Sequence, residues 1–206
     1  MGGDRTPIDQ NAQTIINLGC GYNKLIGAVN VDLYGEPDVR WDLEQTPLPF
    51  EDASADLIIM HHVLEHVKNW WPLVKDCARV LREGGDLHIY VPDWSSHSSL
   101  TYRDHINVFS LYSWHGCMPG LTVHRPGTNA WARERFFEIP LTCYDYKRTP
   151  FKKYNWMLRW PLIYLYRFLA DHMTNFVWEQ IFYFRKVDPE TFLELLKTKK
   201  GVTISI

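Results

Sequence analysis

The first ninety residues are divided into five short apolar runs, and this division constrains the fold more than any other feature of the sequence. Each run is a few residues long, rich in aliphatic side chains, and separated from the next by a turn or a helical spacer. Short buried strands with such spacers are typical of a parallel, doubly wound α/β sheet. The expected strands are Thr14–Leu18, Ala28–Leu33, Val39–Trp41, Asp56–Met60 and Leu87–Val91.

One helix is predicted clearly, just before the fifth strand. Asn69 stands at a suitable N-cap position and Pro72 falls in the first turn, where its missing N–H is tolerated. Gly84 and Gly85 are the expected C-terminal stop, because glycine adopts the left-handed conformation that ends many helices. The apolar face of this helix consists of Leu73, Val74, Cys77, Val80 and Leu81. Helix and strand together predict a βαβ crossover.

Size and composition fit one soluble domain spanning residues 1–206. The net charge of −2 gives no strong signal for nucleic acid, although residues 147–200 hold 11 Lys and Arg against 5 Asp and Glu. Four scattered cysteines form no zinc spacing. The start of the chain is polar and no apolar run approaches the roughly 20 residues of a membrane span. We expect a reduced, cytoplasmic protein of unspecified oligomeric state.

The turn after the first strand is the first candidate binding element. Asn17-Leu18-Gly19-Cys20-Gly21 places two glycines at the carboxyl end of a strand, where the backbone can approach a ligand closely. A tight structural turn is the plainer interpretation of a lone G-x-G. Position 24 is Lys, so the G-x-G-x-x-G pattern of dinucleotide sites is absent and a ligand without a pyrophosphate is favoured.

Two acidic residues extend this candidate site. Asp32, at the end of the second strand, can accept hydrogen bonds from both hydroxyls of a ribose, although a surface Asp in a turn would look the same. It follows Gly19 by only 13 positions, so the intervening helix must be short or irregular. Asp42 can accept from an adenine amine while Leu43 packs on the ring.

Five motifs in one register resemble the "type 11" class I methyltransferases. They are NLGCG, VDL, WDLEQTPLPFEDASADLI, HHVLEH and ARVLREGGDLHIYVP, and they run through residues 14–92. The resemblance implies a Rossmann-like, mostly parallel seven-stranded sheet with an antiparallel edge strand. It further implies that S-adenosyl-L-methionine is the cofactor, bound by residues 14–92, while residues 93–206 form the substrate side.

The resemblance also assigns residues. Gly19, Cys20 and Gly21 would line the methionine end of the cofactor, and Asp32 with Leu33 would hold the ribose. Asp42 and Leu43 would frame the adenine. Asn17 stands where many family members carry an acidic residue, so its contact with the cofactor's amino group would differ from theirs. His61 and His62 would border the methyl group and the acceptor.

A competing motif overlaps these histidines. His62-Val63-Leu64-Glu65-His66 spells H-x-x-E-H, a zinc peptidase signature in which two histidines on one helix share a metal. This interpretation would leave the surrounding cofactor motifs unexplained. We therefore expect no metal here and treat His66 as a structural helix residue.

The second half of the chain holds the expected acceptor side. Asp104 and His105 begin a DH-x-x-x-F segment, so His105 joins His62 as a candidate catalytic residue, with a purely structural His as the alternative. Arg135–Tyr146 and Gln180–Val187 are the last two expected strands. Between them, an aromatic and basic insertion over residues 151–178, with a helix opened by Pro161, fits core packing, a membrane-surface contact or a substrate cap.

These features predict methyl transfer to an O, N or C nucleophile, most simply on a small-molecule, glycan or lipid-like acceptor. Because the cofactor already carries an activated methyl group, such catalysis depends mainly on positioning. A cofactor-binding subunit without transferase activity is the alternative, since fold and cofactor alone do not establish turnover.

Overall fold

A computed structural model describes residues 13–114, 139–150, 162, 164–165 and 177–198 of the chain. Its centre is one seven-stranded sheet in the order β3-β2-β1-β4-β5-β7-β6. The strands are β1 (Ile15–Leu18), β2 (Val29–Asp32), β3 (Val39–Arg40), β4 (Ala55–His61), β5 (Leu81–Pro92), β6 (Leu141–Pro150) and β7 (Val177–Lys186).

The sheet confirms the predicted doubly wound, mostly parallel architecture and places its antiparallel strand. Strands β1 to β5 pair in parallel, and β7 is antiparallel to both of its neighbours, β5 and β6. The antiparallel strand therefore lies one position inside the edge, because β6 follows it. The order reverses between β1 and β4, and in open α/β sheets ligands bind at the carboxyl ends of the strands beside such a reversal.

The connection between β1 and β2 contains no helix, whereas the spacing predicted a short or irregular one. Residues 19–28 run as consecutive turns, and the buried side chain of Asn30 holds them in place. Its Nδ2 donates to the carbonyls of Leu25 and Ala28, and its Oδ1 accepts from the Asn17 amide at 2.9 Å. The Asn30 side chain thus bonds backbone carbonyls that, in a helix, would accept from backbone N–H groups.

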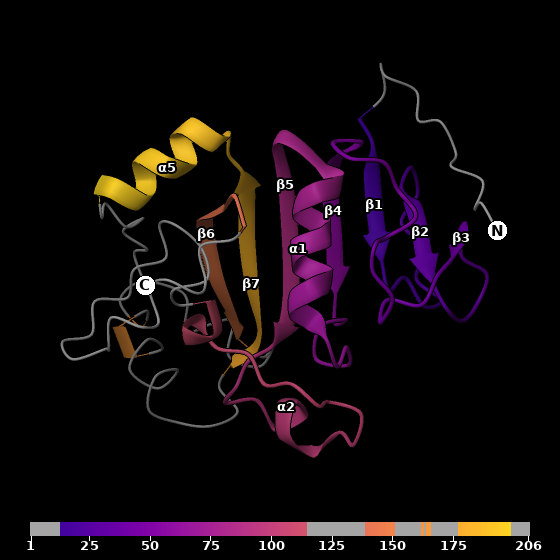
Figure 1. Cartoon of the computed structure of the whole chain (residues 1–206). Helices are drawn as coiled ribbons and strands as arrows, with labels where there is room; N and C mark the ends of the chain where they lie inside the picture. The colour runs from indigo at the N-terminus through magenta and orange to yellow at the C-terminus, as the bar shows by residue number, and fades with distance from the viewer. Residues whose placement is uncertain (1–12, 115–138, 151–161, 163, 166–176, 199–206) are drawn as a thin grey trace.

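The predicted helix is present as α1 (Trp70–Val80), which lies across β4 and β5 (Figure 1). Asn69 is its N-cap residue, without a side-chain hydrogen bond. Its C-terminal boundary corrects the sequence prediction. Leu81 is already extended and pairs with Ala55 at the start of β5, so the glycines do not end the helix.

The two glycines instead belong to a bulge inside β5. Leu81 pairs with Ala55 and Asp86 with Leu57, so four residues of β5 lie opposite one residue of β4. Gly84 has a φ of +74°, and a Cβ on Gly85 would come within 2.9 Å of the Arg82 carbonyl oxygen. Bulges commonly require such left-handed or crowded positions, and glycine fills them.

Beyond β5 the chain packs through aromatic side chains. Trp114 is fully buried and its ring lies 5.2 Å from the rings of both Trp70 and Phe184. It belongs to a 3₁₀ turn at Leu111–Trp114 that follows the short helix α2 (His97–Thr101). The remaining described helix is α5 (Pro189–Thr198), which follows β7 (Figure 1). These contacts fix β7 against β5 and α1.

Several predictions for the second half fall outside the described residues. The helix opened by Pro161 and nearly all of the aromatic insertion over residues 151–178 belong to this group. The two predicted strands of this half are present, shifted to Leu141–Pro150 and Val177–Lys186. No described helix is long and apolar enough to cross a membrane.

Candidate functional site

The turn after β1 is held close to the segment that follows β4. Gly19 has a φ of +71°, and a Cβ added there would lie 2.3 Å from Cγ2 of Val63. The N–H groups of Gly19 and Cys20 both donate to the carbonyl of Val31, at 2.8 and 3.2 Å. Glycine is therefore required twice at position 19, by its backbone angle and by the contact with Val63.

Gly21 differs from Gly19 in its surroundings. Its φ is +52°, and a Cβ there would meet nothing within 4 Å, so the space above it is open. Its N–H donates to Oδ2 of Asp32 at 2.7 Å, while Oδ1 of Asp32 accepts from Tyr34 N at 2.9 Å. Each carboxylate oxygen has a second lone pair, which leaves an acceptor for each of two ribose hydroxyls. The open space and these acceptors fit a nucleoside.

The predicted adenine residues lie beside this carboxylate. Trp41 N donates to the carbonyl of Asp32 at 3.0 Å, and this bond brings the segment after β3 next to the end of β2. Oδ1 of Asp42 accepts from Glu44 N at 3.0 Å, and Leu43 is partly buried against the core. Leu33 is 38% exposed at the end of β2. The arrangement is compatible with the predicted roles, which remain predictions.

Two other predicted cofactor residues are buried. Asn17 lies within β1, with its amide bonded to Asn30, and so supports the turn from inside the sheet. Cys20 is almost fully buried, and burial followed by the charges of Asp32 and Asp38 raises the pKa of its thiol. Such a thiol stays protonated at neutral pH and is no nucleophile.

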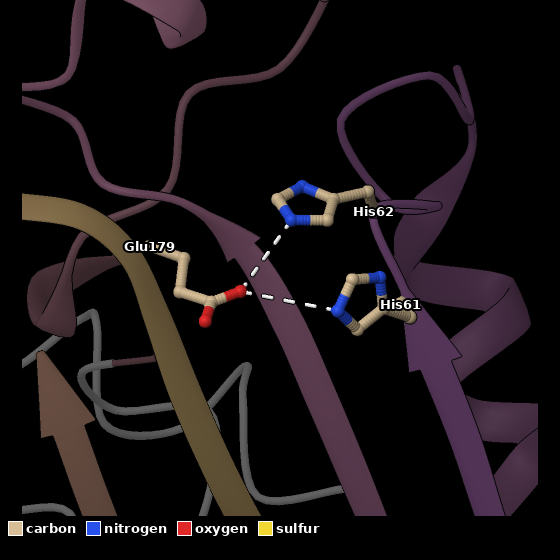
Figure 2. Close-up of side chains that lie close together, drawn as sticks. All are labelled: His61, His62 and Glu179. Atoms are coloured by element: carbon tan, nitrogen blue, oxygen red, sulfur yellow. Dashed lines mark ion pairs between the residues drawn. The ribbon is translucent and has the colours of Figure 1, made fainter. Parts of the chain in front are cut away.

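A second group of side chains forms where β4 ends. His61, His62 and Glu179, which we call the histidine–glutamate cluster, come from the end of β4, the next residue and the start of β7 (Figure 2). Oε2 of Glu179 lies 3.4 Å from Nε2 of His62 and 4.0 Å from Nε2 of His61. Both imidazoles point toward this oxygen.

Backbone geometry explains how adjacent residues reach the same carboxylate. Neighbouring side chains of a strand point to opposite faces. His62 has a φ of +55°, in the left-handed region that few non-glycine residues adopt, and its ring lies 4.6 Å from that of His61 in an edge-to-face contact. The left-handed residue thus brings the second imidazole to the side of the first.

Glu65 holds His62 from behind. Its side chain is 1% exposed, and its Oε1 accepts from Nδ1 of His62 at 3.0 Å. Burial lowers the pKa of His62, but hydrogen bonds to Glu179 and Glu65 outweigh burial and raise it to about 9. For His61, burial and then the neighbouring His62 lower the pKa. Of the two, His61 is therefore the neutral imidazole at pH 7.

Aromatic rings border the cluster. The ring of Tyr90 lies 4.9 Å from that of His61, and the ring of Trp178 lies 6.3 Å from that of His62. Glu179 and Trp178 were missed by sequence reasoning, which assigned Gln180–Val187 as the last strand and began it after both residues. The only sequence feature near them was the end of the aromatic insertion, which gave no indication that these residues contact His61 or His62.

The H-x-x-E-H motif does not have the geometry of a peptidase site. Residues 62–67 form turns, so His62 and His66 are not on one helix face, and the assignment of His66 to a helix was wrong. Nδ1 of His66 donates to the carbonyl of Asp104 at 3.1 Å. One oxygen of Glu65 and ring nitrogens of His66 and His105 lie within 4.8 Å of one another, so His105 is beside this second group.

Comparison with known proteins agrees with the motifs. Residues 23–89 match a family described as a methyltransferase domain. A protein of Mycolicibacterium smegmatis named "Probable S-adenosylmethionine-dependent methyltransferase" is 34% identical over 77 residues, which are 37% of this chain and 29% of that protein. A similarly named protein of Mycobacterium tuberculosis is 40% identical over 52 residues, 25% of this chain and 18% of its own length. The matched parts thus span less than a third of these relatives.

Solved structures share the fold over most of the chain. An S-adenosylmethionine-dependent methyltransferase from Archaeoglobus fulgidus has a TM-score of 0.51 at 13% identity, covering 85% of this chain and 87% of that one. The YcgJ protein of Bacillus subtilis has a TM-score of 0.50 at 14% identity, covering 85% and 92%. The sequence matches identify methyltransferase motifs within residues 23–89, and the solved structures share the fold. Both agree with the resemblance to the class I methyltransferases and with S-adenosyl-L-methionine as the cofactor.

Proposed function

We propose that the protein transfers a methyl group from S-adenosyl-L-methionine, bound at the turn after β1, to an acceptor bound at the histidine–glutamate cluster. One observation carries this proposal. Gly19 of the turn packs directly on Val63, the residue after His62, so the two sites adjoin. Proximity of two bound reactants is the main requirement of methyl transfer, because the cofactor supplies an activated methyl group.

The chain's own residues would position the cofactor. Asp32 has an acceptor on each oxygen for the ribose hydroxyls, and Gly21 leaves open space for the methionine end beside Cys20. Asp42 and Leu43, joined to Asp32 through Trp41, would frame the adenine. Asn17 would act by supporting the turn, through its bond to Asn30.

The acceptor class follows from the cluster's chemistry. Two imidazoles and a carboxylate between Tyr90 and Trp178 suit a hydroxyl-bearing small molecule or glycan better than a hydrocarbon chain. Of the candidate bases, His61 is the best placed, being neutral and 60% exposed. His62 carries a proton between two carboxylates and would orient the acceptor, while His105 belongs to the second group, with Glu65 and His66.

Calorimetry with S-adenosylmethionine and its demethylated product tests the cofactor site. We expect Kd values in the micromolar range as an order of magnitude. Asp32→Ala should weaken binding by about 1–3 kcal/mol, because ribose hydroxyls lose charged acceptors. Glu51→Ala, which removes an exposed carboxylate away from the turn, is the matched control. Absence of binding by the intact protein would contradict the proposal.

Turnover is measured separately with labelled cofactor and panels of hydroxylated small molecules, oligosaccharides and lipids. Transfer of label to one acceptor class, lost in His61→Ala with cofactor affinity retained, is the expected result. Tight cofactor binding with no transfer to any class would instead support a non-catalytic, cofactor-binding subunit.

A further inference from the structure

We propose that His61, His62 and Glu179 form a binding site for one divalent transition-metal ion, ligated through Nε2 of each histidine and Oε2 of the glutamate. Two histidines and a carboxylate are a common ligand set for Zn²⁺ and for Fe²⁺. Binding of the ion requires neither cofactor nor acceptor. In the metal-bound protein Nε2 of His61 and of His62 would be ligands, so neither ring would then serve as the base or orienting group described above. The site differs from the sequence-based expectation of no metal, and it shares only His62 with the pair of histidines in the H-x-x-E-H motif.

The distances between the three ligand atoms match a shared ion. All three lie within 4.8 Å of one another, with 3.4 and 4.0 Å between Oε2 of Glu179 and the two ring nitrogens. Metal–nitrogen and metal–oxygen bonds of about 2.0–2.2 Å at tetrahedral angles place ligand atoms about 3.3–3.6 Å apart. The 3.4 Å pair already fits this range, and small side-chain rotations would bring the 4.0 Å pair into it.

The backbone at His62 is a second, independent observation. A left-handed φ of +55° at a non-glycine residue is unfavourable, and such residues cluster at functional sites. Here it has a specific geometric result, since it turns Nε2 of His62 toward the same oxygen that His61 faces. An extended residue 62 would send this ring to the opposite face of the strand.

Glu65 supplies the outer partner that metal-binding histidines usually have. Its buried carboxylate accepts the Nδ1 proton of His62, which fixes the ring and leaves Nε2 as the atom that faces the cluster. Carboxylate–histidine–metal arrangements orient the ligand in this way and increase its basicity. Glu65 thereby links the motif predicted from sequence to the cluster formed by the fold.

The ligand set also favours particular ions and leaves room for another ligand. Nitrogen donors favour Zn²⁺, Co²⁺, Ni²⁺ and Fe²⁺ over Mg²⁺ and Ca²⁺, which prefer oxygen. His61 is 60% exposed, so three protein ligands leave at least one coordination position open to solvent. We infer that an oxygen of the acceptor takes this position, and this second part rests on the proposed function.

The test is titration of chelator-treated, full-length protein with Co²⁺ and Zn²⁺ in the absence of cofactor. We expect one ion per chain, with the visible absorption of Co²⁺ bound by nitrogen and oxygen. Glu65→Gln should weaken binding about 10–100-fold, and His61→Ala or Glu179→Gln at least as much. His97→Ala, which removes an exposed histidine of α2, should leave affinity unchanged.

Two results would overturn the site. One is the absence of stoichiometric binding of either ion. The other is binding that survives both His61→Ala and Glu179→Gln but is lost in His66→Ala, which would move the ion to the group of Glu65, His66 and His105. Circular dichroism and cofactor calorimetry on each variant separate loss of ligands from misfolding. The cofactor site is tested by calorimetry with Asp32→Ala and the metal site by titration of the cluster variants. Either the proposed function or the metal site can therefore fail while the other holds.

Discussion

The turn after β1 and the histidine–glutamate cluster lie side by side but are built differently. The turn consists of backbone groups and one carboxylate, with Gly19 and Asp32 only 13 positions apart. The cluster consists of side chains, and Glu179 follows His62 by 117 positions. A site formed by one short segment can be recognised as a motif in the sequence of that segment. A site formed by two distant strands cannot, because each of its residues, taken alone, has several possible roles.

This difference has an energetic side. The turn depends on positions where only glycine fits, so its sequence is constrained by backbone sterics. The cluster depends on pairing of ionisable groups, and its residues are tolerated only while their partners are present. The turn should therefore respond to added volume, and the cluster to the removal of charge.

The largest effect is expected from adding one methyl group to the turn. Gly19→Ala forces a Cβ to 2.3 Å from Val63 at a φ of +71°, so crowding adds to backbone strain. We expect the free energy of unfolding to fall by about 2–4 kcal/mol. Urea unfolding followed by circular dichroism measures it.

Two matched variants separate the causes. Gly27→Ala carries a similar strain, at a φ of +82°, but its Cβ meets nothing within 4 Å. It should lose only about 1 kcal/mol. Combining Gly19→Ala with Val63→Ala should recover part of the loss. An equal loss in Gly19→Ala and Gly27→Ala would show that the contact between Gly19 and Val63 contributes nothing.

The same contrast explains what the sequence predicted. The five parallel strands and α1 follow from local apolar periodicity, and the structure confirms them. The end of α1 was misplaced because Gly84 and Gly85 suit a helix stop and a strand bulge equally, and only the pairing of Leu81 with Ala55 distinguishes them. Asn30 and Glu179 were missed because a polar residue's partner is set by the tertiary fold.

A middle-sized effect is expected at Glu65, the buried carboxylate behind the cluster. Glu65→Ala leaves Nδ1 of His62 without its acceptor in an interior position. The metal-free protein should lose about 1–3 kcal/mol of unfolding free energy. Glu179→Ala should lose less, because Glu179 is 15% exposed and water can replace it. Equal losses would contradict the assignment of Glu65 as the buried support.

The smallest effect concerns acid stability on the turn side. Hydrogen bonds from Lys24, and then from the backbone and side chain of Asn30, lower the pKa of Asp38 to about 2, against about 3.9 in an unfolded chain. A carboxylate with a depressed folded-state pKa stabilises the protein above its unfolded pKa, and that stabilisation is lost as pH falls through the folded value. The relevant window is therefore between about pH 4 and pH 2.

Asp38→Asn tests this window, because asparagine keeps an oxygen for Asn30 but removes the charge. We expect the intact protein to be the more stable of the two above pH 5, by no more than about 1 kcal/mol, since Asp38 is 41% exposed and solvent screens the pair. The difference should shrink as pH falls toward 2, and added salt should reduce its Lys24 part. Urea unfolding of both proteins at a series of pH values measures it. If the difference in unfolding free energy stays constant from pH 6 to pH 3, Asp38 stabilises the protein through hydrogen-bond geometry alone. The stability of the turn side would then not depend on the charge of Asp38, in contrast to the charge dependence expected of the cluster.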